Sequence, residues 1–263
     1  MGMNSNAPWV EGPYKLIPIP ASSGGVKVHY AVEMANEMAF VHNCFIRGFN
    51  SILLQGPHIP SYGQPDYRPQ DVKDFLLFTD FLIRVLHHHH KVEETVGFPE
   101  IEKEIGEPGF LSVATEQHAQ FHDGLEIIWE MAKTMQNDPS KWTWDAMKQC
   151  LDSFMPVMYT HLVEEIDLFL KLGQFNEKAL KRAWKALEEE AKKIGFAGLY
   201  DTIPTIFGCH DASFQSGGKF PPVPKVFRYL VKHWTSKRNR GVWRFCPCDE
   251  WSRPKPLLFS EGK

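Results

Sequence analysis

The sequence lacks both a long apolar run and a strong net charge. No segment of its 263 residues approaches the roughly 20 consecutive apolar residues that a membrane-spanning helix needs. Residues 1–16 also lack the basic and apolar regions of a signal peptide. The net charge of −3 gives no overall attraction to nucleic acid or to an anionic membrane. We therefore expect a cytoplasmic protein without a transmembrane segment and without a nucleic-acid partner.

Cysteine is scarce as well. The five cysteines are an odd number and are widely scattered, which suits a reducing compartment better than a disulfide framework. Cys209 and His210 could combine with Cys246 and Cys248 into a thiolate metal site. Cys-x-Cys lacks the usual two-residue spacing of zinc ligands, so buried free thiols are the favoured interpretation.

Strand-like alternation is absent, and helical periodicity takes its place. Apolar residues recur at three- and four-residue steps from residue 32, and 43% of all residues are hydrophobic, enough for a sizeable core. Asp71 is a plausible cap for the second helix. Breakers and caps delimit four predicted helices, over residues 32–55, 71–97, 111–135 and 142–172. The predicted fold class is all-α, an up-down four-helix bundle.

Composition divides the chain into three parts. Residues 1–30 are rich in Pro, Gly and Ser and predict an irregular lead-in, and residues 31–173 form the bundle. Residues 174–263 contain an additional helix, capped by Asn176 and ended by Gly195, and then a Pro- and aromatic-rich extension that we expect to pack on the bundle. A basic, aromatic stretch in this extension favours a helix covering the bundle over a membrane or nucleic-acid surface.

Pairs of potential metal ligands recur on three of the predicted helices. Residues four apart on a helix differ by roughly 40° around its axis and about 6 Å along it, so both side chains can bind one object. One such pair alone is an ordinary surface pair about as often as it is part of a metal site. Three pairs on neighbouring helices are an unusual coincidence. The candidate metal ligands are His42, His89, Glu93, His118, His122, His161 and Glu165.

The histidine run at residues 87–90 leaves one choice open. His89 is the expected ligand because Glu93 follows it by four residues. His90 with Glu94 is the same pair rotated by roughly 100° and is the alternative. His87 and His88 are expected to point elsewhere, to solvent or beside the ligands.

Five imidazoles and two carboxylates are too many ligands for one zinc and too rich in nitrogen for calcium or magnesium. Two iron ions fit better, with both carboxylates and a solvent-derived oxygen bridging them and one coordination position open. Manganese or a mixed-metal site would use the same ligands. The Glu-x-x-His pattern of ferritin-like sites and the His-Glu-x-x-His pattern of metalloproteases are both absent.

These residues resemble a known family. His42, the stretches "HHKVEE" and "HAQFH", and "HLVEE" over roughly residues 30–172 look like the hemerythrin-like, or HHE-type, metal-binding fold. The resemblance implies a non-heme di-iron centre with an oxo or hydroxo bridge. It places His118, His122 and His161 on one iron, His42 and His89 on the other, and Glu93 and Glu165 between them. Blood-type hemerythrins have an aspartate where Ile166 stands here, which argues against reversible oxygen storage.

The expected function is to bind or activate dioxygen, or a related diatomic such as NO. The alternative is a di-iron oxidase or oxygenase that acts on a small organic substrate, with the C-terminal extension shaping its pocket. Iron storage and iron or oxygen sensing are weaker alternatives. Helical phase suggests an apolar lining from residues such as Phe45, Leu86, Phe121 and Ile166.

Overall fold

The structure of the chain is a computed structural model that describes residues 12–20, 28–215 and 217–260. Within these residues the regular elements are helices, apart from one isolated antiparallel bridge between Cys248 and Pro254. The prediction of an all-α fold is therefore confirmed. Of the predicted lead-in, residues 1–11 and 21–27 lie outside the described part. Residues 12–20 are held by Asn43 and Asn50, whose side-chain amides bond the backbone of this segment.

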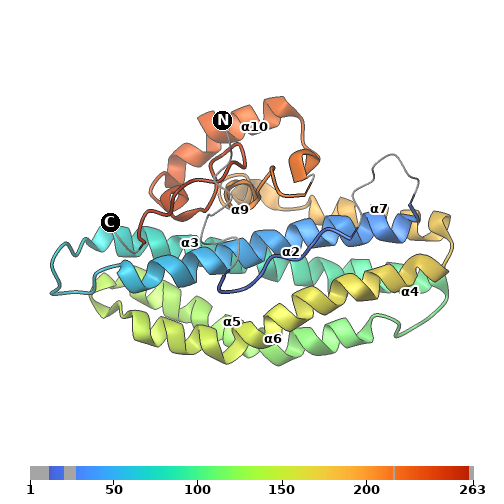
Figure 1. The fold of residues 1–263 in the computed structure, drawn as a ribbon, viewed down its shortest axis with the longest axis horizontal. Coiled ribbons are helices and arrows are strands. Elements are labelled where there is room, and N and C mark those ends of the chain that lie inside the picture. The colour runs from blue at the N-terminus through green and yellow to red at the C-terminus, as the bar shows by residue number, and fades with distance from the viewer. Residues whose placement is uncertain (1–11, 21–27, 216, 261–263) are drawn as a thin grey trace.

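Four long helices run side by side along the long axis of the molecule (Figure 1). They are α2 (Tyr30–Gln55), α3 (Pro69–Val92), α5 (Ser112–Asn137) and α6 (Trp144–Lys171). Aromatic side chains fill the space between them; Phe45, Phe49, Phe75, Phe78, Phe121 and Phe169 are almost fully buried. Burial of each such side chain stabilises the fold by about 1.5–3 kcal/mol. Among the helices of the described residues, none is both long enough and apolar enough to cross a membrane.

The start of α3 differs from the prediction. Arg68 is the N-cap residue and Pro69 follows it, at a position where the missing N–H of proline costs nothing. Asp71 is therefore not the cap and lies in the first turn. Its carboxylate accepts a 2.8 Å hydrogen bond from Arg244, which ties the C-terminal extension to this helix.

The end of α3 also differs, because the helix does not stop at Gly97. It passes through one π-helical turn (Glu93–Gly97) and continues as α4 (Phe98–Ile105), which Gly106 ends with φ 75°. Pro99 cannot donate an i→i−4 hydrogen bond, and the wider π turn directly before it accommodates that loss without breaking the helix. Gly97 faces α7 closely, since a Cβ atom there would lie 2.5 Å from Leu187.

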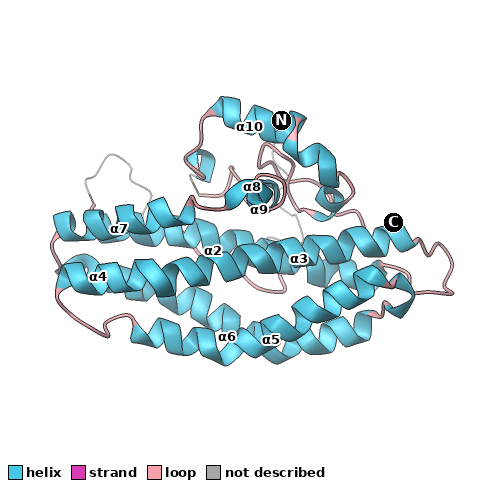
Figure 2. Cartoon of the chain, turned by 180° about the vertical axis from the view of Figure 1, so that it is seen from behind, coloured by secondary structure: helices cyan, strands magenta, loops and turns pink. Residues whose placement is uncertain are grey.

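The remaining chain forms shorter helices. They are α7 (Glu177–Ala191), α8 (Gly195–Gly198), α9 (Thr202–Cys209) and α10 (Lys225–His233). Asn176 caps α7 as predicted, by accepting from two backbone N–H groups, but α7 ends at Ala191, four residues before Gly195. Figures 1 and 2 show α8, α9 and α10 on the side of α2 and α3, with α5 and α6 on the opposite side of the bundle.

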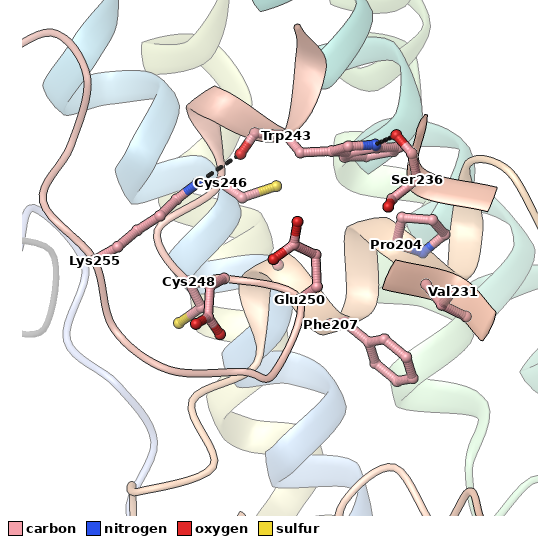
Figure 3. A pocket seen from close by; sticks show the side chains of 11 residues that line it. Pro204, Phe207, Val231, Ser236, Trp243, Cys246, Cys248, Glu250 and Lys255 are labelled. Carbon is pink, nitrogen blue, oxygen red and sulfur yellow. Dashed lines mark hydrogen bonds between the residues drawn. The ribbon is translucent and has the colours of Figure 1, made fainter. Parts of the chain in front are cut away.

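The C-terminal extension contains a small cavity of about 190 Å³ of its own (Figure 3). Cys246 and Cys248 lie on its wall, and their sulfur atoms point in different directions. A hydrogen bond with Cys246, together with burial, raises the pKa of the Cys209 thiol well above its ordinary value. Protonated thiols are poor metal ligands, and in the described residues no group of potential metal ligands includes a cysteine. The interpretation as buried free thiols fits this arrangement.

Candidate metal centre

His42 of α2 is oriented toward the bundle interior by its own hydrogen bond. Its Nδ1 lies 2.8 Å from the carbonyl oxygen of Leu162, an atom that can only accept, so Nδ1 carries the hydrogen. In the neutral ring Nε2 then carries a lone pair. That nitrogen is 3.2 Å from Nε2 of His89 and 3.2 Å from a carboxylate oxygen of Glu165.

The first group of potential ligands consists of His42, His89, Glu93 and Glu165. His89 and Glu93 come from one face of the α3 helix and the π turn that follows it, and Glu165 comes from α6. Nε2 of His89 lies 3.1 Å from Oε1 of Glu93. Both carboxylates are about 1% exposed, so solvent does little to stabilise their charges.

The second group consists of His90, His118 and His161, all buried. Nε2 of His118 and Nε2 of His161 are 3.0 Å apart. The opposite nitrogens donate hydrogen bonds, from His118 to Glu94 over 2.7 Å and from His161 to Gln117 over 3.1 Å. These bonds turn both Nε2 lone pairs toward the same point, the arrangement by which outer residues orient metal-binding histidines.

The two carboxylates lie between the groups. Glu93 approaches His89 with Oε1 and His118 with Oε2, at 3.1 and 3.8 Å. Oε2 of Glu165 is 3.2 Å from Nε2 of His42 and 3.7 Å from Nε2 of His161. Each carboxylate therefore reaches both groups, as a bridging ligand must.

The unsatisfied atoms of this centre fit a pair of cations. Both oxygens of Glu93, both oxygens of Glu165 and Nε2 of His90 are buried without a hydrogen-bond partner. Such atoms are rare and costly in a protein interior unless something else pairs with them. Converging lone pairs from four helical segments repel one another, and positive metal ions remove that repulsion.

Burial sets the ionisation of the histidines. It lowers the pKa of His161 to about 3, and it lowers the pKa values of His89 and His90 well below the ordinary value, with neighbouring imidazoles adding to the effect. These rings are neutral near pH 7, the form that binds metals. Burial, with the nearby charges of Glu165 and Glu94, raises the pKa of Glu93 well above its ordinary value, so a cation is needed to keep it ionised.

The structure brings together six of the seven predicted ligands and leaves His122 outside. The His122 side chain is 58% exposed and lies near Asp123 and Glu126. The buried side of α5 runs through His118, Phe121 and Leu125, and His122 is one residue off this stripe. Phe121 takes the adjacent space, 5.4 Å from the ring of His90 and 5.5 Å from that of His161.

His90 is the third imidazole beside His118 and His161, the position predicted for His122. The four consecutive histidines, His87 to His90, face four different surroundings. His89 joins the first group and His90 the second, so the two are not alternatives. His88 Nε2 lies 3.2 Å from the carbonyl oxygen of Ala191 in α7. His87 faces Glu126 of α5 at 3.3 Å. The sequence signal for His90 was present, since Glu94 follows it by four residues, but Glu94 bonds His118 instead.

A large cavity of about 1160 Å³ adjoins the first group. His89 and Glu93 form part of its wall, together with apolar side chains of α2 such as Val41 and Phe45. The opposite wall comes from α7, α8, α9 and residues 220–223 and 227 of the extension. Of the predicted apolar lining, Phe45 lies on this cavity and Phe121 packs on the second group, while Leu86 and Ile166 are buried in the core.

Fold and site together define a four-helix metal-binding protein, and the comparisons with known proteins agree. The Hemerythrin HHE cation binding domain matches residues 36–172, and the chain belongs to this family. It is also 35% identical over 254 residues to the "Dimeric xanthone biosynthesis cluster protein R11" of Cryptosporiopsis sp. (strain 8999). The matched region covers 95% of this chain and 93% of that protein. No solved structure matches the chain.

Proposed function

We propose that the chain is a di-iron oxidoreductase that uses dioxygen to oxidise an apolar organic molecule. One observation carries this proposal: His89 and Glu93 belong to the buried ligand group and also line a cavity of about 1160 Å³. A protein that only carries or senses a diatomic gas needs no such space. Binding pockets for small organic molecules commonly have volumes of about 300–1,000 Å³, so a ligand of that kind fits here.

The proposed ligand set gives the two ions different surroundings. It consists of His90, His118 and His161 for one ion, His42 and His89 for the other, and Glu93 and Glu165 between them. The ion held by His42 and His89 would have one imidazole fewer and so would have room for a further ligand. His89 also lines the cavity in which a substrate would lie. Bound iron would supply the redox chemistry and the site for dioxygen; manganese fits the same donors.

The protein's own residues position the ligands. Leu162, Glu94 and Gln117 accept hydrogen bonds from the ligand histidines and fix their ring orientation. Gln117 in turn donates to Glu164 over 2.6 Å, which holds the amide in place. Loss of such outer partners typically reduces metal affinity or activity about 10- to 100-fold.

The cavity wall indicates the substrate class. Most of its lining is apolar, including Val41, Phe45 and Ile206, and its polar groups are few, among them Glu37 and Lys192. A largely apolar molecule with one or two polar substituents matches this lining. The name of the relative from Cryptosporiopsis sp. refers to a biosynthesis cluster, which is consistent with an activity on an organic molecule.

The first test measures iron and the visible spectrum of the protein, reduced without oxygen and then exposed to air. We expect about two irons per chain and a spectrum that changes irreversibly in air, because an oxidase consumes dioxygen. His161→Ala should lose about one iron and the spectral change, while His58→Ala, at an exposed position, should keep both irons and the change. A spectrum that returns on deoxygenation would instead indicate a carrier.

The second test fills the cavity without replacing a ligand. Val41→Trp places a large side chain on the cavity wall, and Val113→Trp adds the same bulk at a position that is 48% exposed. Titration with anilinonaphthalene sulfonate, an aromatic anion whose fluorescence rises in apolar cavities, should show at least a tenfold weaker Kd for Val41→Trp alone, roughly 1.4 kcal/mol. Equal probe binding by both variants, with iron retained, would exclude this cavity as the substrate site.

A further inference from the structure

A third group of potential metal ligands lies on the outer surface of the bundle, where α3 meets α5. It contains His87 of α3 and His122 and Glu126 of α5, whose ligand atoms all lie within 4.8 Å of one another. His87 Nε2 is 3.3 Å and His122 Nε2 is 3.8 Å from the same oxygen of Glu126. The proposed oxidation uses none of these residues, so the group needs its own explanation.

The His87 ring is held in place with its Nε2 toward Glu126. The ring packs against Trp129, with centroids 5.3 Å apart, and Trp129 is itself fixed by a 2.6 Å hydrogen bond that it donates to Asp80. Nε2 of His87 is buried and has no hydrogen-bond partner. The ring thus leaves a buried nitrogen unsatisfied beside a carboxylate.

We propose that His87, His122 and Glu126 form a zinc-binding site that is open to solvent. Tetrahedral zinc has bonds of about 2.0–2.1 Å to nitrogen and oxygen, which places its ligand atoms about 3.3 Å apart. The observed separations of 3.3 and 3.8 Å need only small rotations to reach this geometry. Two imidazoles, one carboxylate and a water molecule are a ligand set that zinc uses in proteins.

The exposure of the site determines how it exchanges metal. The side chains of His122 and Glu126 are 58% and 40% exposed, so zinc enters directly from solvent and a water completes its coordination. His122 and Glu126 are one helical turn apart on α5, and His87 reaches the ion from α3. Bound zinc therefore joins the two helices and stabilises the native bundle according to its affinity.

The test uses the full-length protein as purified, with its buried centre filled. Co²⁺ serves as the spectroscopic probe, because tetrahedral Co²⁺ gives strong visible bands, and Zn²⁺ binding is measured by calorimetry. We expect wild type to bind one more ion than His122→Ala. Glu126→Gln should bind that ion at least about tenfold more weakly, since it loses one of three protein ligands. His58→Ala, which removes an exposed imidazole elsewhere, should behave as wild type.

Three results would overturn the proposal: equal metal binding by wild type and His122→Ala, an unchanged affinity in Glu126→Gln, or octahedral rather than tetrahedral Co²⁺ bands. The comparison depends on the difference between wild type and His122→Ala. A metal that enters the buried centre contributes equally to both proteins and cancels. The result is thus independent of whether the buried centre oxidises a substrate.

Discussion

Two histidines, His90 and His122, exchange the roles that their sequence positions suggested. His122 stands four residues after His118, but its side chain is 58% exposed, whereas His90 is 8% exposed as a residue and lies among the second group. The difference arises because the buried face of α5 passes through Phe121 and not through His122, the next residue. A step of one residue rotates a side chain by roughly 100°, enough to move it from a buried to an exposed face. Ligand spacing on one helix therefore does not show which way that helix faces.

A matched pair of variants tests this exchange. We expect His90→Ala to retain about one iron per chain after desalting, because one of the three imidazoles of its ion is lost, and His122→Ala to retain about two. The measurement is iron content by elemental analysis alongside circular dichroism to establish folding. Iron loss in His122→Ala with full retention in His90→Ala would restore the ligand set predicted from the sequence.

Glu94 has a supporting role that its position beside Glu93 conceals. It accepts a 2.7 Å hydrogen bond from Nδ1 of His118 and so keeps Nε2 free for metal. We expect Glu94→Gln to lower iron affinity about 10- to 100-fold while leaving the fold intact, because the amide can hold the ring but adds no negative charge. Competition with a chelator of known affinity measures the change, with Glu100→Gln as a control that removes a half-buried carboxylate paired with Lys103 on α4. Equal affinities in both variants would remove Glu94 from the support of the centre.

At the scale of elements, the joint between α3 and α4 shows how packing selects a backbone form. The sequence pair Gly97 and Pro99 suggested a helix end, since both residues are poor helix formers. The chain instead makes a π turn and continues, and α7 packs closely at Gly97. Glu93 begins this turn, so the same irregularity sets the direction of a proposed metal ligand.

A substitution at this joint should be destabilising for a steric reason. In Gly97→Ala the new Cβ would lie 2.5 Å from Cδ1 of Leu187, so α7 or that side chain must move. We expect a loss of about 1–3 kcal/mol in the free energy of unfolding. Urea denaturation measures it, and the double variant with Leu187→Ala should show a smaller added cost because the space is vacated. Additive effects of the two substitutions would show that this contact does not carry the strain.

At the scale of the whole molecule, the C-terminal extension turns a metal-binding bundle into one with a large cavity. The cavity exists because α7, α8, α9 and residues near 220 lie against α2 and α3. Ser51 and Gln55 of α2 bond the carbonyl oxygen of Phe245, and Arg244 bonds Asp71 and Asp74 of α3. These contacts join segments about 170–200 residues apart and hold the extension against the bundle.

The folded extension should be destabilised in acid through His210. This ring is 1% exposed and donates to the carbonyl oxygen of Gly217 over 2.8 Å, and burial lowers its pKa to about 4. The unfolded chain binds a proton below about pH 6.5 and the folded chain only below about 4, so stability falls as the pH drops through that window, by up to about 3 kcal/mol. His210→Gln keeps a donor but does not titrate, and its unfolding free energy should fall less between pH 6.5 and 4 than that of wild type.

The sequence by itself determined the helices and two of the three predicted ligand pairs, because both depend on local periodicity and spacing along one helix. It predicted the four long helices closely, the Asn176 cap, and six of the seven residues that the structure gathers at the centre. Only the tertiary structure decided that His90 and not His122 faces the interior, that Glu94 supports His118, and that the extension encloses a cavity beside His89. These features depend on the rotation and packing of helices that are distant in sequence, which no local pattern records.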